Sequence, residues 1–193
     1  DSFLRATGLN AAHTHRIRLD EAPLPSLSLE AYSGVIVGGG PGCVSDPPET
    51  KDPLEARIEA DILGLMPEIM AREMPYMGCC YGLGILAAHL GGEVSNAQYG
   101  EPIGGVDCTL PEAGRQDPLL GGLPQSFRAL VGHTATQFHP EADGDSFATR
   151  IRSYKGHGYF DPAEADDLIA NALAEKVSVP AKILRAFVDR FAA

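Results

Sequence analysis

The chain has 193 residues, enough for one domain with a buried core, and 44% of them are hydrophobic while 21% are charged. Its formal net charge of −11 at neutral pH argues against nucleic acid or an anionic membrane as a partner, since both would repel an acidic surface. No apolar run reaches the roughly 20 residues that cross a bilayer, and no signal-peptide layout follows Asp1. We therefore expect a cytoplasmic protein with a single domain over residues 1–193.

The first half of the chain alternates helical and extended patterns. A short helix over residues 2–9 is followed by the β-branched run "YSGVIVGGG", which predicts a buried strand ending in glycines. Apolar residues at helical spacing in "DPLEARIEADILGLM" predict an amphipathic helix that Pro67 ends or kinks. "MPYMGC" then predicts a short strand, and "YGLGILAAHL" a helix closed by Gly91 and Gly92.

The second half has shorter extended segments and two closing helices. "EPIGGVDCTL", "FRALVGH" and "TQFHPE" are typical of antiparallel strands, and residues 162–176 and 180–191 have helical patterns. Alternating strands and helices predict an α/β fold. We expect a flavodoxin-like three-layer sandwich, in which a mostly parallel central sheet has helices on both faces and a small antiparallel extension. Ligands of such sheets bind at the carboxyl ends of the strands.

The pentapeptide "GCCYG" at residues 78–82 lies between a predicted strand and a predicted helix. It fits the pattern G-x-nucleophile-x-G of a sharp turn called a nucleophile elbow, and this register selects Cys80. A thiol at a helix N-terminus also meets partial positive charge, which favours the thiolate. Cys79 then points away as a small buried hydrophobe. The alternative interpretation of Cys80 is that it too is an inert thiol in the core.

The four cysteines of the chain have neither CxxC nor zinc spacing, which indicates reduced thiols with no structural disulfide and no metal site. A catalytic role for Cys80 also needs a base that accepts the thiol proton. "TQFHPE" offers His139, two residues before Glu141. Alternate residues of a strand share one face, so Glu141 can orient His139 and His139 can accept the thiol proton. The alternative is an ordinary polar strand end.

The segment "VGGGPG" at residues 37–42 predicts an exposed turn after a strand, where N–H groups can face a developing oxyanion. The candidate donors are the N–H groups of Gly40 and Tyr81. A dinucleotide-binding loop is the competing interpretation, but G-x-G-x-x-G needs a glycine where Cys43 stands.

In order along the chain, "GGGPG", "MGCCYG" and "TQFHPE" resemble the class I (triad) glutamine amidotransferases, especially the amidotransferase domain of GMP synthase and its free-standing relatives. The resemblance also includes "YGEPIG", "DPLLGGLP" and "LVGHT". It implies that Cys80 is the nucleophile, His139 the base and Glu141 the orienting acid, with Gly40 and Tyr81 forming the oxyanion hole. It implies hydrolysis of the glutamine side-chain amide without a cofactor, through a γ-glutamyl thioester, and transfer of ammonia to a separate synthase. Substrate-binding positions carried over by the resemblance are Gly39, Gly84 and His133.

Three features depart from this family. Gly84 stands where the family has a glutamine that holds the substrate, "LVGHT" runs directly into "ATQFHPE", and the first family strand would precede Asp1. We therefore expect a missing N-terminal strand and a missing segment near residues 134–135. A γ-glutamyl peptide or amide hydrolase and an inactive binding or regulatory module of the same fold stay open. Peptidases and chaperones of the DJ-1 type place histidine directly after the cysteine, and Tyr81 argues against them.

Overall fold

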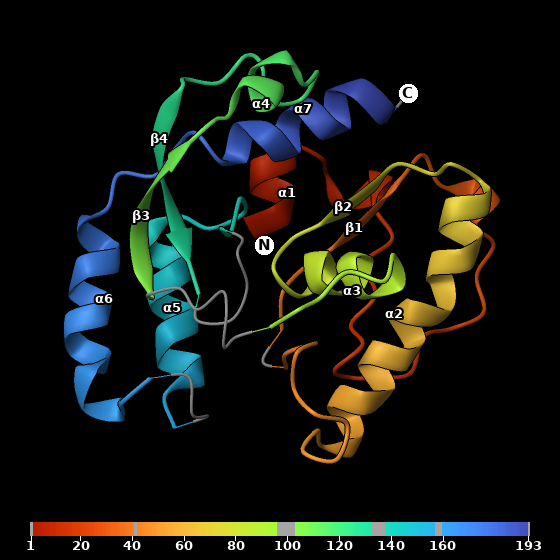
Figure 1. Cartoon of the computed structure of the whole chain (residues 1–193), viewed down its shortest axis with the longest axis horizontal. Helices are drawn as coiled ribbons and strands as arrows, with labels where there is room; N and C mark the ends of the chain where they lie inside the picture. Colours follow the sequence, from red (N-terminus) through yellow and green to blue (C-terminus); the bar gives the residue numbers. More distant parts are fainter. Residues whose placement is uncertain (1, 41, 96–102, 133–137, 157–159, 193) are drawn as a thin grey trace.

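The computed structural model describes residues 2–40, 42–95, 103–132, 138–156 and 160–192. Helices and strands are mixed in an α/β arrangement (Figure 1), which confirms the expected fold class. The expected gap near residues 134–135 and the candidate residue His133 lie outside the described residues. Within those residues, no helix combines the length and the apolar character needed to cross a membrane.

Two short parallel strands carry one half of the molecule. Strand β1 (Val35–Val37) pairs with β2 (Tyr76–Gly78), and the register places Val37 opposite Gly78. Helix α2 (Pro53–Ala71) is capped by Asp52, whose side chain accepts a hydrogen bond from the N–H of Glu55. Helix α3 (Tyr81–His89) follows β2 directly. One core cluster joins these elements, and its buried members are Leu29, Ile62, Met66, Ile69, Tyr81 and Ile85.

We expected Pro67 to end or kink the long helix. It does not end the helix, because α2 continues to Ala71. A proline inside a helix removes one backbone hydrogen bond and costs about 3 kcal/mol. The side chains on either side of it, Met66 and Ile69, are almost completely buried. Burial of two such side chains contributes roughly 1.5–3 kcal/mol each, which is enough to offset the cost of the proline.

An antiparallel ladder carries the other half. Strand β3 (Gly104–Thr109) pairs with β4 (Ser126–Val131), and helices α5 (Gly144–Tyr154) and α6 (Ala165–Ala174) pack beside it (Figure 1). The buried members of this second core cluster are Leu130, Ala142, Phe147, Ile151, Ala165 and Ala172. The remaining helices are α1 (Ser2–Thr7), which packs on α7 (Ala181–Phe191), the short α4 (Glu112–Gln116), and the 3-10 turns Ala11–His13, Leu29–Ala31 and Pro162–Glu164.

The parallel sheet is smaller than expected. In the described part of the chain β1 and β2 form one two-stranded sheet and β3 and β4 another. Phe138 makes an isolated bridge to Val131, and the first two residues of the predicted strand "TQFHPE" lie outside the described residues. Helix α5 was not expected from the sequence, although this helix lies directly after the predicted base.

Candidate active site

Cys80 occupies the sharp turn between β2 and α3. Its backbone has φ 56° and ψ −108°, a conformation that residues with a side chain rarely adopt and that is typical of a nucleophile elbow. The preceding residue, Cys79, donates its N–H to the carbonyl of Val37 (2.8 Å) and is completely buried. Burial raises the pKa of the Cys79 thiol far above its usual range. Cys79 is thus buried directly after β2, while Cys80 lines a cavity.

Two glycines make this turn possible because backbone passes where their side chains would be. A Cβ on Gly78 would lie 2.5 Å from the carbonyl of Gly82, and a Cβ on Gly82 would lie 2.5 Å from the carbonyl oxygen of Val37. Both distances are too short for a carbon atom. The spacing of glycines around Cys80 therefore reflects the close packing of α3 against β1 and β2.

Replacing Gly82 by alanine is expected to destabilise the protein by roughly 1–3 kcal/mol, since backbone must move to admit the methyl group. The matched control is Gly64 in α2, where a Cβ has open space, and Gly64→Ala is expected to stabilise by about 0.5–1 kcal/mol. Urea unfolding of both variants measures the two free energies. Equal signs for the two changes would contradict the packing described for the elbow.

His139 and Glu141 come from the segment between β4 and α5. The N–H of His139 donates to the carbonyl of Leu130 (2.8 Å), and the N–H of Ala142 donates to the carbonyl of His139 (3.1 Å). Pro140 and Glu141 thus form a turn and not the end of a strand. The alternation argument for this pair is wrong, although the side chains do meet: His139 Nδ1 lies 3.0 Å from Glu141 Oε1.

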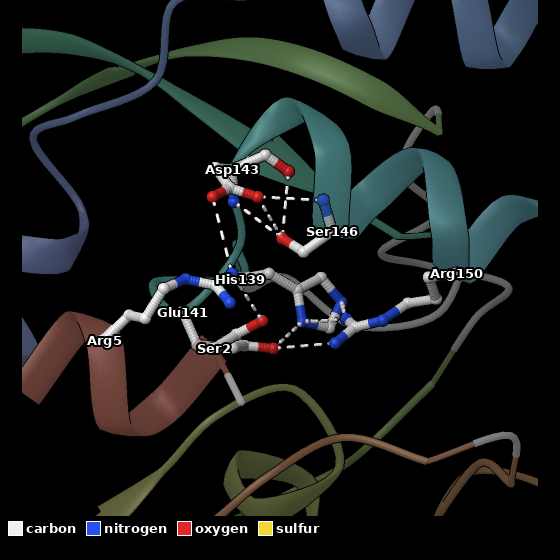
Figure 2. A network of polar contacts seen from close by, with 7 residues as sticks. All are labelled: Ser2, Arg5, His139, Glu141, Asp143, Ser146 and Arg150. Carbon is white, nitrogen blue, oxygen red and sulfur yellow. Dashed lines mark hydrogen bonds and ion pairs between the residues drawn. The ribbon is translucent and has the colours of Figure 1, made fainter. Parts of the chain in front are cut away.

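The N-terminus of α5 fixes this turn from the other side. Asp143 accepts a hydrogen bond from the N–H of Ser146 (2.8 Å), and its own N–H donates to the Ser146 hydroxyl (2.9 Å), a capping box. Arg5 of α1 lies 3.5 Å from the Asp143 carboxylate. Figure 2 shows these contacts beside the His139 and Glu141 side chains. The start of α5 therefore holds the histidine segment in place.

The sulfur of Cys80 and the imidazole of His139 meet across Gly39. A Cβ on Gly39 would lie 3.3 Å from the Cys80 Sγ and 3.3 Å from the Cε1 of His139, so both groups border the same point. Gly39 therefore faces the gap between the two side chains. The residues that line the cavity there are Gly40, Cys80, Ile103, Gly132, His139, Phe147, Arg150, Ile151, Tyr154 and Phe160.

Arg150 joins this group although the sequence pattern did not single it out. It stands on α5, and its Nη2 lies 2.9 Å from Glu141 Oε1 while its Nη1 lies 2.6 Å from Nδ1 and 3.1 Å from Nε2 of His139 (Figure 2). The available signal was helical: "DGDS" is typical of a helix start, and Phe147 and Ile151 repeat at helical spacing. On that helix Arg150 adjoins the buried Ile151.

Electrostatics favour an ionised Glu141 beside His139. Burial alone would raise the pKa of Glu141, but the hydrogen bond from His139 and the charges of His139 and Arg150 lower it to about 2. Burial lowers the pKa of His139, yet its contacts with Cys80 and Glu141 raise it above its usual value, and Arg150 acts against them. The imidazole is thus held between groups that favour and disfavour its charge.

The low pKa of Glu141 has a consequence for stability in acid. Because this pKa falls from 4.5 to about 2 on folding, the carboxylate stabilises the protein above pH 4.5, and this contribution is lost as the pH falls toward 2. The stability difference between wild type and Glu141→Gln is expected to shrink by about 3 kcal/mol over that range. Urea unfolding at several pH values measures it. Glu164→Gln, at an exposed carboxylate, is the control and should change stability by less than about 0.5 kcal/mol. A constant difference across the range would contradict the assignment.

The other predicted positions surround Cys80. Gly40 lines the cavity, and Tyr81 is the first residue of α3, where backbone N–H groups have no partner within the helix. Gly84 is buried, and a Cβ there would lie 3.0 Å from Val44 Cγ2. Val44 therefore fills space that a larger side chain at position 84 would need. Within the described ranges, no group of three or more His, Cys, Asp or Glu is arranged to hold a metal ion.

The sequence of this chain also matches a known protein family over most of the segments described above. A family model described as glutamine amidotransferase class-I matches residues 4–136, which is more than half of the chain. The chain belongs to the class I glutamine amidotransferase family. The matched range includes Cys80 and ends shortly before His139.

Curated relatives of the chain carry GMP synthase names. It is 27% identical over 115 residues to a glutamine-hydrolyzing GMP synthase subunit of Haloquadratum walsbyi, covering 60% of this chain and 52% of the relative. It is 31% identical over 112 residues to the glutamine-hydrolyzing GMP synthase of Symbiobacterium thermophilum, covering 58% of this chain and 19% of the relative. The chain thus spans about half the length of the GMP synthase subunits it matches.

Solved structures show the same fold. The crystal structure of SMU.1228c matches with a TM-score of 0.71 and 16% identity, covering all of this chain and 94% of the other. A glutamine amidotransferase from Thermotoga maritima matches with a TM-score of 0.63 and 22% identity, covering 87% of this chain and 81% of the other. The glutamine amidotransferase fold of the chain therefore rests on both sequence and structure.

Proposed function

We propose that this family member hydrolyses the side-chain amide of glutamine to glutamate and ammonia, with Cys80 as nucleophile, His139 as base and Glu141 as its orienting acid. One observation carries the proposal: Cys80 at a strained turn and His139 on a separate segment border the same point in one cavity, and His139 contacts a buried carboxylate. This is the arrangement that activates a thiol for attack on a carbonyl carbon.

The reaction follows from these positions. The imidazole of His139 takes the thiol proton, and the Cys80 sulfur bonds to the amide carbon, whose oxygen becomes negatively charged. The N–H groups of Gly40 and Tyr81 stabilise this oxyanion. His139 then gives the proton to the departing nitrogen, which leaves as ammonia, and a γ-glutamyl thioester remains. Water, deprotonated by His139, cleaves the thioester and releases glutamate and the thiol.

The test combines turnover with labelling. The protein is incubated with glutamine while ammonia is measured, and in parallel with 6-diazo-5-oxo-L-norleucine, a glutamine analogue that alkylates nucleophilic thiols. We expect ammonia release and a mass increase on the peptide that contains Cys80. A folded protein that releases no ammonia and stays unlabelled would overturn the proposal and favour a binding or regulatory module.

One observation favours a second candidate, a γ-glutamyl peptide or amide hydrolase. The environment of Gly84 is apolar and filled, with Val44 3.0 Å and Val94 3.9 Å from the position of its missing Cβ, so the residue offers no polar group to hold glutamine. The cavity beside His139 also has apolar walls, including Ile103 and Phe160. Comparing kcat/KM for glutamine with that for γ-glutamyl anilides and γ-glutamyl dipeptides decides between the two substrates.

A separate synthase is the proposed recipient of ammonia. The support is that several relatives are named as one subunit of a glutamine-hydrolyzing GMP synthase, together with the class I family. Glutamine hydrolysis that speeds up when a candidate synthase and its acceptor are added would support such a partner. Hydrolysis that stays the same with every candidate would favour a free-standing hydrolase.

A further inference from the structure

Arg150 contacts the other two residues of the proposed triad, His139 and Glu141. Its Nη2 lies 2.9 Å from Glu141 Oε1, and its Nη1 is within 3.1 Å of both ring nitrogens of His139. We propose that Arg150 is a positioning residue, which fixes the Glu141 carboxylate against His139 and biases the imidazole toward its neutral, proton-accepting form. The inference rests on the proposed function and goes beyond its triad.

The first argument concerns the burial of Glu141. Its side chain is 1% exposed, and its Oε2 is buried with no hydrogen-bond partner among the described residues. A carboxylate in such a place is costly to ionise unless a cation or hydrogen bonds compensate. In the described part of the chain, the ion-pair contacts of Glu141 are with His139 and Arg150, and only the guanidinium is charged at every pH of interest. Arg150 therefore keeps the carboxylate ionised whether His139 carries one proton or two.

The second argument concerns the proton count of His139. With its Nδ1 hydrogen directed at Glu141, the neutral ring has its lone pair on Nε2, the atom that takes the Cys80 proton, and the Arg150 Nη1 lies 2.6 Å from Nδ1 and 3.1 Å from Nε2. A guanidinium has donors and no acceptor, so it cannot accept a hydrogen bond from either ring N–H, and its positive charge lies beside both ring nitrogens. Once His139 takes the Cys80 proton, two positive groups face each other. Arg150 thus favours return of that proton to the leaving nitrogen.

Few other charged groups near the His139 ring could oppose its protonation. Among the described residues, the ionisable groups around the ring are Cys79, Cys80, Glu141, Arg150 and Tyr154. Burial raises the pKa of both the Cys79 thiol and the Tyr154 hydroxyl, so both stay neutral while His139 titrates. The positive charge that opposes the imidazolium is therefore that of Arg150.

The position of Arg150 on its helix is also held. Phe147 and Ile151, on the same helix, are buried in the core cluster of β4 and α6. The Arg150 side chain is 28% exposed, so it reaches from that packed helix into the cavity and not into bulk solvent. A fixed helix with a cation directed at the base is the geometry that a positioning role requires.

The first experiment measures the titration of His139 by NMR in protein labelled with ¹⁵N-histidine, where His139→Gln identifies the signal. In Arg150→Met the midpoint is expected to rise by about one to three pH units, because a neighbouring positive charge is removed. In Arg150→Lys, which keeps the charge without the planar fork, the rise should be smaller. Arg152→Met, an exposed arginine of the same helix, is the matched control and should leave the midpoint unchanged. An unchanged midpoint in Arg150→Met overturns the inference.

The second experiment measures kinetics with glutamine in the same variants. We expect kcat of Arg150→Met to fall by roughly tenfold or more with little change in KM, and the acidic limb of kcat/KM to move upward, while Arg150→Lys recovers part of kcat. A rise in KM with unchanged kcat overturns the inference and assigns Arg150 to a substrate carboxylate.

Because the NMR titration needs no turnover, an inactive wild type with a shifted midpoint in Arg150→Met rejects the proposed function alone. If Arg150→Met does not fold, Arg150→Gln replaces it.

Discussion

Replacing Cys80 by serine is expected to reduce ammonia release from glutamine by roughly 10⁴-fold or more while the protein stays folded. The serine hydroxyl has the same shape but is a far weaker nucleophile than the thiol, and removal of a nucleophile typically costs about as much as loss of the whole triad. Coupled measurement of ammonia with glutamate dehydrogenase determines the rate. Circular dichroism and thermal unfolding establish that Cys80→Ser is folded.

The neighbouring thiol provides the matched control. Cys79 is completely buried directly after β2, so Cys79→Ala is expected to lose about 1 kcal/mol of stability and to keep activity within a few-fold of wild type. Equal loss of activity in the two variants would contradict the register in which Cys80 alone faces the cavity. Labelling that persists in Cys80→Ser and disappears in Cys79→Ala would show that the chemistry had been assigned to the wrong cysteine.

The second large effect is expected for His139→Gln. Glutamine is close to histidine in size but cannot accept the thiol proton and return it, so kcat should fall by roughly 10²–10⁴-fold with a small change in KM. Rates over pH 6–9 should also lose the dependence on pH that a titrating base produces.

His89 serves as the control for this change, since it is the last residue of α3 and does not line the cavity. His89→Gln is expected to keep wild-type kcat. If His139→Gln retained more than about a tenth of the wild-type rate, another group would have to serve as the base, and the proton path through His139 would be rejected.

The elbow is the part of the site that the sequence predicts best. The glycines at 78 and 82 are required because backbone atoms come within 2.5 Å of the positions that their Cβ atoms would occupy, and the pattern G-x-nucleophile-x-G marks this requirement in the sequence. The pattern of two glycines around one nucleophile therefore specifies both the turn and the residue at its centre. The backbone of Cys80, with φ 56°, matches this expectation.

Other features depend on contacts that the sequence does not display. The sequence predicts that His139 and Glu141 face each other, and they do, but a turn through Pro140 brings them together and not the alternation of a strand. Arg150 lies nine positions after Glu141 and meets it only because α5 folds back over the turn. The number of strands in the sheet also escaped prediction, since an apolar run indicates a strand and not how many neighbours it pairs with.

The crowded backbone at the elbow also limits how the family member can be redesigned. With Val37, Gly78 and Gly82 locked together, changes of substrate preference have to come from the outer walls of the two cavities that border Cys80. Val44 and Val94 form one such wall, and Ile103 and Phe160 belong to the other. A library for altered substrate choice should therefore randomise these four positions and leave the turn untouched.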